Sequence, residues 1–140
     1  VLQGLWKFGN DWVFDSRLSY TYQKAQDFTD KSDKDTYGGQ ISYIPWHSGS
    51  AILNAGYKSW ELNYSFIYTG ERYDVSANTP ENYRLPWYTS DFSLAKKFSW
   101  RKYDFKLTLE VNNIFNQQYE VVRSYPMPGT NFKFILNLTI

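Results

Sequence analysis

Apolar side chains recur at every second position over long parts of this chain. This pattern is typical of β-strands that turn one face to an apolar environment and the other face to water. The last ten residues, NFKFILNLTI, show it most clearly, and Ile135 is their one exception. The apolar face of this closing strand consists of Phe132, Phe134, Leu136, Leu138 and Ile140. Apolar positions nowhere recur at three and four residues over more than two turns, so the pattern does not predict helices.

The alternation predicts about seven strands of roughly 8–14 residues, which is long enough to cross a bilayer at a tilt. The predicted strands lie at 1–8, 11–23, 50–58, 60–73, 90–100, 103–111 and 131–140. Residues 37–44, YGGQISYI, are a candidate for an eighth strand. The sequence therefore predicts an all-β antiparallel meander, and no change of composition marks a second domain.

The connections between these strands alternate in length. The short turns are 9–11, 58–59 and 99–102, and the long loops are 25–49, 74–89 and 113–130. In an up-and-down sheet, every short turn then lies at one end and every long loop at the other. Outer-membrane β-barrels show this asymmetry, with short periplasmic turns and longer extracellular loops. A soluble β-sandwich with ordinary core aromatics is the alternative, but it has no reason to sort its loops in this way.

The composition also fits a sheet between lipid and water. Aromatic residues make up 21% of the chain, including 13 Tyr and 6 Trp, yet the average hydropathy is negative. Aromatics gather near strand ends, which predicts two interfacial girdles. The girdle by the short turns contains Trp6, Trp12, Trp60, Trp100 and Tyr103, and the girdle by the long loops contains Trp46, Tyr73, Trp87 and Tyr88.

The charged and catalytic residue types argue against several classes of function. The net charge of +1 gives no reason to expect a nucleic-acid partner. The chain has no Cys and one His, His47, which excludes a thiolate or two-histidine metal site and a histidine-based triad within it. Glu61 and Glu110 fall on the polar faces of different strands, where charges are the default in a barrel lumen. We therefore expect no enzyme active site.

One acidic loop, DFTDKSDKDT, is a candidate calcium site. Its carboxylates belong to Asp27, Asp30, Asp33 and Asp35. Carboxylates at such spacing can ligate Ca²⁺, but the loop lacks the Gly and terminal Glu of an EF-hand. Lys31 and Lys34 also offset its charge. We expect a solvated loop and no cofactor, with calcium as the single open alternative.

Five short elements in order resemble the closing region of TonB-dependent outer-membrane receptors. They are SYTYQKA, YIPWH, YTGERYD, VNNIFNQQYE and SYPMPGTNFKF, and the resemblance covers essentially all 140 residues. The family carries Tyr-x-Gly-x-Arg-Tyr, Asn-x-Phe-x-x-x-Tyr and Pro-Gly-Arg elements before its terminal strand. The matching positions here are Tyr68, Gly70, Arg72, Tyr73, Asn113, Phe115, Tyr119, Pro128 and Gly129. Thr130 stands where the family usually has Arg, and Ile140 stands where it usually ends on Phe or Trp.

The resemblance implies that residues 1–140 are the C-terminal part of a 22-stranded outer-membrane barrel whose lumen holds a plug domain. The plug and the N-terminal strands are then absent from this sequence. The apolar side chains of the closing strand would face lipid and the polar ones the lumen. Because unpaired backbone groups are costly in lipid, these strands would have to close with the missing ones or pair with another copy.

The resemblance also implies a function and partners. The intact receptor would take up a large scarce nutrient (an iron–siderophore, haem or cobalamin) across the Gram-negative outer membrane, with energy delivered by TonB. The barrel-assembly machinery would insert it, and the motif spacing is most similar to cobalamin-type receptors. Loop residues of the ligand vestibule would be Trp46, His47, Trp87, Arg123, Tyr125 and Met127. The last loop can equally serve strand closure alone.

Two other interpretations remain from the periodicity. One is a complete eight-stranded outer-membrane barrel with a structural or adhesive role. The other is a soluble lipocalin-like ligand binder, in which the apolar face lines the interior and the polar face meets water. Periodicity alone does not say which face points outward.

Overall fold

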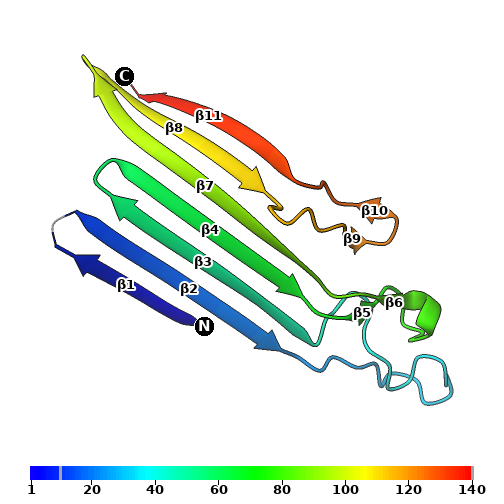
Figure 1. The fold of residues 1–140 in the computed structure, drawn as a ribbon. Helices are drawn as coiled ribbons and strands as arrows, with labels where there is room; N and C mark the ends of the chain where they lie inside the picture. Colours follow the sequence, from blue (N-terminus) through cyan, green and yellow to red (C-terminus); the bar gives the residue numbers. More distant parts are fainter. Residues whose placement is uncertain (10, 140) are drawn as a thin grey trace.

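The computed structural model describes residues 1–9 and 11–139, which form one large antiparallel sheet of seven strands (Figure 1). The strands follow one another in space as they do in the chain, in the order β1-β2-β3-β4-β7-β8-β11. Their bounds are β1 Leu2–Phe8, β2 Trp12–Tyr22, β3 His47–Tyr57, β4 Trp60–Thr69, β7 Trp87–Trp100, β8 Tyr103–Asn112 and β11 Asn131–Thr139. The predicted all-β meander is confirmed, while Ile140 of the predicted closing strand lies outside the described residues.

Two small hairpins and one helical turn lie outside this sheet. The elements are β5 Arg72–Tyr73 paired with β6 Tyr83–Arg84, β9 Glu120–Val122 paired with β10 Tyr125–Pro126, and the 3₁₀ turn η1 Pro80–Asn82. In the part of the chain that the structure describes, no helix is long and apolar enough to cross a membrane.

The candidate eighth strand at 37–44 is wrong. This segment consists mostly of turns, and its one ladder contact is an isolated bridge between Gln26 and Gln40. The backbone reverses there because Gly38 and Tyr43 both have positive φ, at 80° and 60°. Strand β3 instead begins at His47 and β7 at Trp87, so both take in residues that the pattern had assigned to loops.

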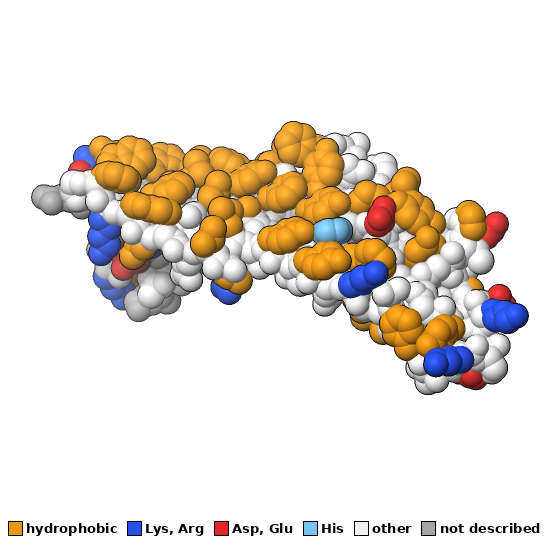
Figure 2. All heavy atoms as spheres, turned by 90° about the horizontal axis from the view of Figure 1, so that it is seen from below, with side chains coloured by type: hydrophobic (Ala, Val, Ile, Leu, Met, Phe, Trp, Pro, Cys, Tyr) orange, Lys and Arg blue, Asp and Glu red, His pale blue; other side chains and the backbone are white. Residues whose placement is uncertain are grey.

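The strand register gives the sheet one apolar and one polar face. Residues that lie opposite each other in an antiparallel ladder point to the same face. One row across all seven strands reads Trp6, Phe14, Ala55, Leu62, Leu94, Leu109 and Phe134. The neighbouring row, on the other face, reads Leu5, Asp15, Asn54, Asn63, Ser93, Glu110 and Lys133. Figure 2 shows hydrophobic side chains gathered in a band along the molecule.

The apolar face has no second layer over it. Ala95 is the one hydrophobic residue that is buried among the described residues, whereas Phe132 is 76% and Phe134 67% exposed. A β-sandwich would have placed these aromatics in a core between two sheets, so the sandwich alternative is wrong. Contiguous exposed apolar surface of this extent marks a site of contact with a partner or a membrane.

The sheet also has two open edges. β1 pairs only with β2 and β11 only with β8, and the two edge strands lie on opposite sides of the sheet (Figure 1). Each edge presents backbone N–H and C=O groups without strand partners. The described residues therefore form an open sheet rather than a closed barrel.

Short and long connections lie at opposite ends, as the sequence predicts (Figure 1). We call the end with the connections 9–11, 58–59 and 101–102 the turn end, and the end with 23–46, 70–86 and 113–130 the loop end. Lys58 and Arg101 adopt positive φ of 52° and 56°, which fits the tight two-residue turns that match strand twist.

Candidate functional site

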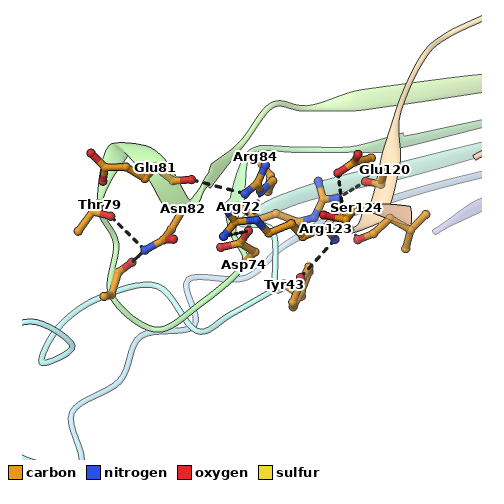
Figure 3. Close-up of polar contacts among 12 residues, drawn as sticks. Tyr43, Arg72, Asp74, Thr79, Glu81, Asn82, Arg84, Glu120, Arg123 and Ser124 are labelled. Atoms are coloured by element: carbon orange, nitrogen blue, oxygen red, sulfur yellow. Dashed lines mark hydrogen bonds and ion pairs between the residues drawn. The ribbon is translucent and has the colours of Figure 1, made fainter. Parts of the chain in front are cut away.

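The three long connections at the loop end are joined into one unit, which we call the loop block (residues 23–46, 70–86 and 113–130). A buried arginine, Arg72, links the second connection to the third. Its side chain is 3% exposed, and Nη2 donates to the carbonyl oxygens of Glu120 at 2.8 Å and Val121 at 3.2 Å (Figure 3). Burial is the main cause that lowers the pKa of this guanidinium. Arg72, which matches the Arg of the Tyr-x-Gly-x-Arg-Tyr element, therefore joins the second connection to the third.

Asp74 lies two residues further along and gathers two more arginines. Its side chain is 1% exposed, and Oδ2 accepts from Nε of Arg84 at 2.8 Å. Nη1 of Arg123, from the third connection, lies 3.5 Å from the same oxygen, and the Arg123 backbone N–H donates to the Tyr43 hydroxyl at 3.4 Å (Figure 3). The second and third connections therefore meet at this carboxylate, where pairing offsets the cost of burying its charge, and the first connection joins the same cluster through Tyr43.

Asn113 organises the connection between β8 and β11. It is 4% exposed and has a positive φ of 50°, a conformation that Asn tolerates better than most residues. Its Nδ2 donates to the carbonyls of Gln117 at 2.9 Å and Pro128 at 3.1 Å, and its Oδ1 accepts from the Gln117 N–H. The Thr130 hydroxyl donates to the Asn113 carbonyl at 2.7 Å. Thr130, in the usual position of an Arg, thus helps to close the loop.

Gly70 is required by a close backbone approach. Its N–H donates to the His47 carbonyl at 2.8 Å, and a Cβ at this position would lie 2.6 Å from that oxygen. Any larger residue would therefore push β4 away from the start of β3. Among the other family-like positions, Tyr68 pairs with Tyr88 on the apolar face and Tyr73 packs edge-on against Tyr83.

A cleft of about 490 Å³ lies between the β6–β7 segment and the β8–β11 connection. The Trp87 and Tyr119 rings, both in its wall, are stacked with centroids 4.4 Å apart. Burial, followed by the charge of Asp91, raises the pKa of Tyr119. The other polar lining residues are Tyr83, Arg84, Gln117, Gln118 and Glu120. The volume suits a small ligand or one part of a larger ligand.

The structure does not gather the six predicted vestibule residues. Trp87 lines the cleft, but Arg123 belongs to the Asp74 cluster. Tyr125 and Met127 line a separate apolar depression with Val121 and Val122.

The other two predicted vestibule residues precede or open β3. Trp46 lies beneath Lys24, whose Nζ is 5.2 Å from the ring centroid. His47 is a strand residue and points to the apolar face, where a hydrogen bond of 2.7 Å joins its Nδ1 to the Tyr20 hydroxyl. These six positions therefore do not form one site.

The five aromatics of the predicted girdle at the turn end all fall on the apolar face in the register. The girdle at the loop end is wrong for Trp87. Trp87 is opposite Thr69 and so lies on the polar face, while its neighbour Tyr88 lies on the apolar face. Phe115 extends this apolar side, and its ring centroid lies 6.3 Å from that of Tyr88.

Three of the four aspartates of the acidic loop act as local turn acceptors, and Asp35 donates its backbone N–H to one of them. Asp27 Oδ1 accepts from the Thr29 N–H, Asp30 Oδ1 from the Ser32 N–H, and Asp33 Oδ1 from the Asp35 N–H. Within residues 1–9 and 11–139, no three carboxylate or imidazole side chains are grouped so that they could hold a metal ion. The structure thus does not bring these four residues together as a ligand set.

The polar face carries a continuous chain of side-chain contacts. Ser93 Oγ donates to Asn63 Oδ1 at 3.1 Å, and Asn63 Nδ2 donates to Asn54 Oδ1 at 2.5 Å. Asn54 Nδ2 in turn donates to Asp15 Oδ2 at 3.0 Å. Nearer the turn end, Glu61 pairs with Lys97 and with Lys106, the latter at 2.6 Å. This face is satisfied by hydrogen bonds and ion pairs of the kind expected beside water.

Comparison with known families gives one match. A family model described as TonB dependent receptor-like, beta-barrel, matches residues 2–114. The match takes in six of the seven strands of the sheet, from β1 to β8. A search of curated protein sequences finds no match.

Proposed function

We propose that these residues form part of the wall of an outer-membrane nutrient receptor, on the premise that the chain belongs to the TonB-dependent receptor-like β-barrel family. The observation that carries this proposal is the unbroken apolar row across seven strands, with a polar row beside it on the opposite face. Lipid can cover the first row, and a water-filled lumen can solvate the second.

The open edges support a place within a larger barrel. Backbone groups without partners cost several kcal/mol each in hydrocarbon, so β1 and β11 need further strands beside them. In the proposed receptor, these 140 residues are the C-terminal part of a 22-stranded barrel. The missing strands and the plug domain come from sequence outside this chain.

The cleft at the loop end is the proposed ligand-contact region of this segment. It lies beside Trp87, whose strand position faces the lumen, and its walls are held by the buried Arg72 and Asn113 contacts. The proposed ligands are an iron–siderophore, haem or cobalamin, and the proposed energy source is TonB. Cobalamin is our first choice among them because of the motif spacing YTGERYD…VNNIFNQQYE.

Uptake by cells that express the receptor tests this proposal. Labelled cyanocobalamin, haemin and a ferric siderophore are supplied separately, with and without a functional TonB. We expect TonB-dependent uptake of one probe, and we expect Trp87→Ala to weaken its binding about tenfold through loss of the stacked wall. Phe115→Ala, on the apolar side of the same loop end, is the matched control. Absence of energy-dependent uptake of any of the three probes would refute the proposed transport of these nutrients.

A further inference from the structure

Four aromatic rings at the turn end each carry a cation. Nζ of Lys58 lies 5.1 Å from the centroid of Tyr57, and Nζ of Lys96 lies 4.4 Å from that of Trp60. The Arg101 guanidinium lies 5.2 Å from Trp100, and Nζ of Lys102 lies 5.2 Å from Tyr103. We call Lys58, Lys96, Arg101 and Lys102 the cationic rim. Among the described residues, the loop end has one such pair, Lys24 with Trp46.

The cationic rim lies on the lipid side of the wall. Tyr57 is opposite Trp60 and Trp100 is opposite Tyr103, and both pairs belong to the apolar face. A cation that stacks on these rings is therefore held toward the outside of the sheet. Lys97 and Lys106 are different, because they pair with Glu61 on the polar face.

Lys96 is the most unusual member, since its strand position is on the apolar face. Lys96 is opposite Trp60, the first residue of β4, and therefore lies beside the turn at 58–59. There its Nζ donates to the Ser59 hydroxyl at 2.7 Å. A lysine on the lipid face is costly at the membrane midplane and cheap near the interface, so this position fixes the turn end at headgroup depth.

Most of the rim charge is not neutralised within the protein. Lys58 has a weak partner in Asp11, with 3.8 Å between the charged atoms. Within the described residues, no carboxylate lies at ion-pair distance from Lys96, Arg101 or Lys102. Asp104, the nearest acidic residue in the β7–β8 hairpin, lies on the polar face and accepts from the Ser99 hydroxyl at 2.6 Å.

We propose that the cationic rim binds the phosphate headgroups of anionic phospholipids in the leaflet at the turn end. This inference rests on the proposed membrane location of the sheet. Interfacial aromatics place the rim at headgroup level, and Lys and Arg beside an anionic surface are each attracted to it. Arg101 can hold two phosphate oxygens at once, which a lysine cannot do with fixed geometry.

Lipid preference of the intact receptor tests the rim. The receptor is reconstituted in phosphatidylcholine vesicles with and without phosphatidylglycerol, and retained lipids are counted by native mass spectrometry. We expect the wild type to retain phosphatidylglycerol preferentially. In the triple variant Lys58→Gln, Arg101→Gln, Lys102→Gln, the ratio of retained phosphatidylglycerol to phosphatidylcholine should fall about tenfold or more. This variant leaves Lys96 and its hydrogen bond to Ser59 in place, so the contact between β7 and the β3–β4 turn is kept.

The matched control removes the same charge at the opposite end, with Lys24→Gln, Lys31→Gln and Lys34→Gln. It should keep the wild-type lipid preference. Equal retention of both lipids by the wild type, or equal loss in the two triple variants, would overturn the rim proposal and leave the receptor proposal standing. A receptor that inserts into neither vesicle would overturn both.

Discussion

At the turn end of the sheet, β3 and β4 are joined by two residues, whereas at the loop end β2 and β3 are joined by residues 23–46. The turn end consists of tight hairpin turns, with Arg101 beside Trp100 in one of them. The ion pair that joins neighbouring hairpins there, Glu61 with Lys97, is partly exposed. The loop end is held by contacts between residues far apart in sequence, and Arg72 and Glu120 are 48 positions apart. Tight turns and partly exposed contacts therefore build one end, and a few polar contacts of buried side chains build the other.

The largest expected effect comes from Arg72→Ala. The variant leaves the carbonyls of Glu120 and Val121 without their charged donor and removes a buried side chain, so we expect the loop block to lose about 3 kcal/mol of local stability. Amide hydrogen exchange at Glu120–Val122 should then become about a hundredfold faster. Lys97→Ala removes a partly exposed ion pair with Glu61 at the turn end and should change exchange in β4 and β7 less than fivefold. Similar changes at both sites would contradict the distinction between the two ends.

Two glycines of the β3–β4 hairpin offer a second comparison. At Gly70, by the loop end, a Cβ would lie 2.6 Å from the His47 carbonyl oxygen, but at Gly56, by the turn end, the nearest atom would be 3.8 Å away. Gly70→Ala should therefore cost about 1–3 kcal/mol, and Gly56→Ala should cost nothing or stabilise slightly. Thermal unfolding of the detergent-solubilised receptor measures both, and an equal loss in the two variants would show that the close approach does not matter.

Alkaline pH should have the smallest effect on local stability, and this effect should be confined to the loop end. The pKa of Tyr119 is raised above its ordinary value of 10.0, chiefly by burial. Because the folded state holds this proton more tightly, protonated Tyr119 contributes fully to folding stability below about pH 10. This contribution is lost as the pH rises through the pKa of Tyr119 in the folded state. Proteolysis of residues 113–130 should accelerate in that range, and less so in Tyr119→Phe. Identical acceleration in the variant would rule out this tyrosine as the cause.

The sheet could be predicted from the sequence because its information is local. Alternation of side chains has a period of two, so any segment that keeps it reveals its own two faces. This is why Phe134 and Leu136 were placed on the apolar face correctly, together with the turn-end aromatics. The sorting of connections needed only the spacing between those segments.

The loop block could not be predicted in the same way. Its form depends on which carbonyls the buried side chains of Arg72 and Asn113 reach, and no periodic pattern encodes such a partner. Residue type alone places Trp87 in the lipid-facing girdle, but its alternation with Tyr88 places it on the polar face, and that alternation requires the strand to begin at Trp87. The sequence of the acidic loop does not distinguish a turn from a calcium site, because the same residue types favour both.

The cationic rim falls between these two cases. Lys58, Arg101 and Lys102 lie in predicted short turns, so their position was available from the sequence. Their orientation was not, because Lys58 and Arg101 occupy left-handed turn positions that carry no face of their own. Lys96 is the one member whose orientation the sequence indicates, because it is a charged residue at an apolar-face position of its strand.

The most direct test of the account is the environment of the two faces along β8 and β11. These 140 residues contain no cysteine, so single cysteines can be placed at Leu109 and Phe134 on the apolar face and at Glu110 and Lys133 on the polar face. In the membrane-embedded receptor, a water-soluble maleimide should label the Glu110→Cys and Lys133→Cys variants and spare the Leu109→Cys and Phe134→Cys variants. Equal labelling of all four positions, or labelling of the apolar pair alone, would contradict a wall between lipid and water.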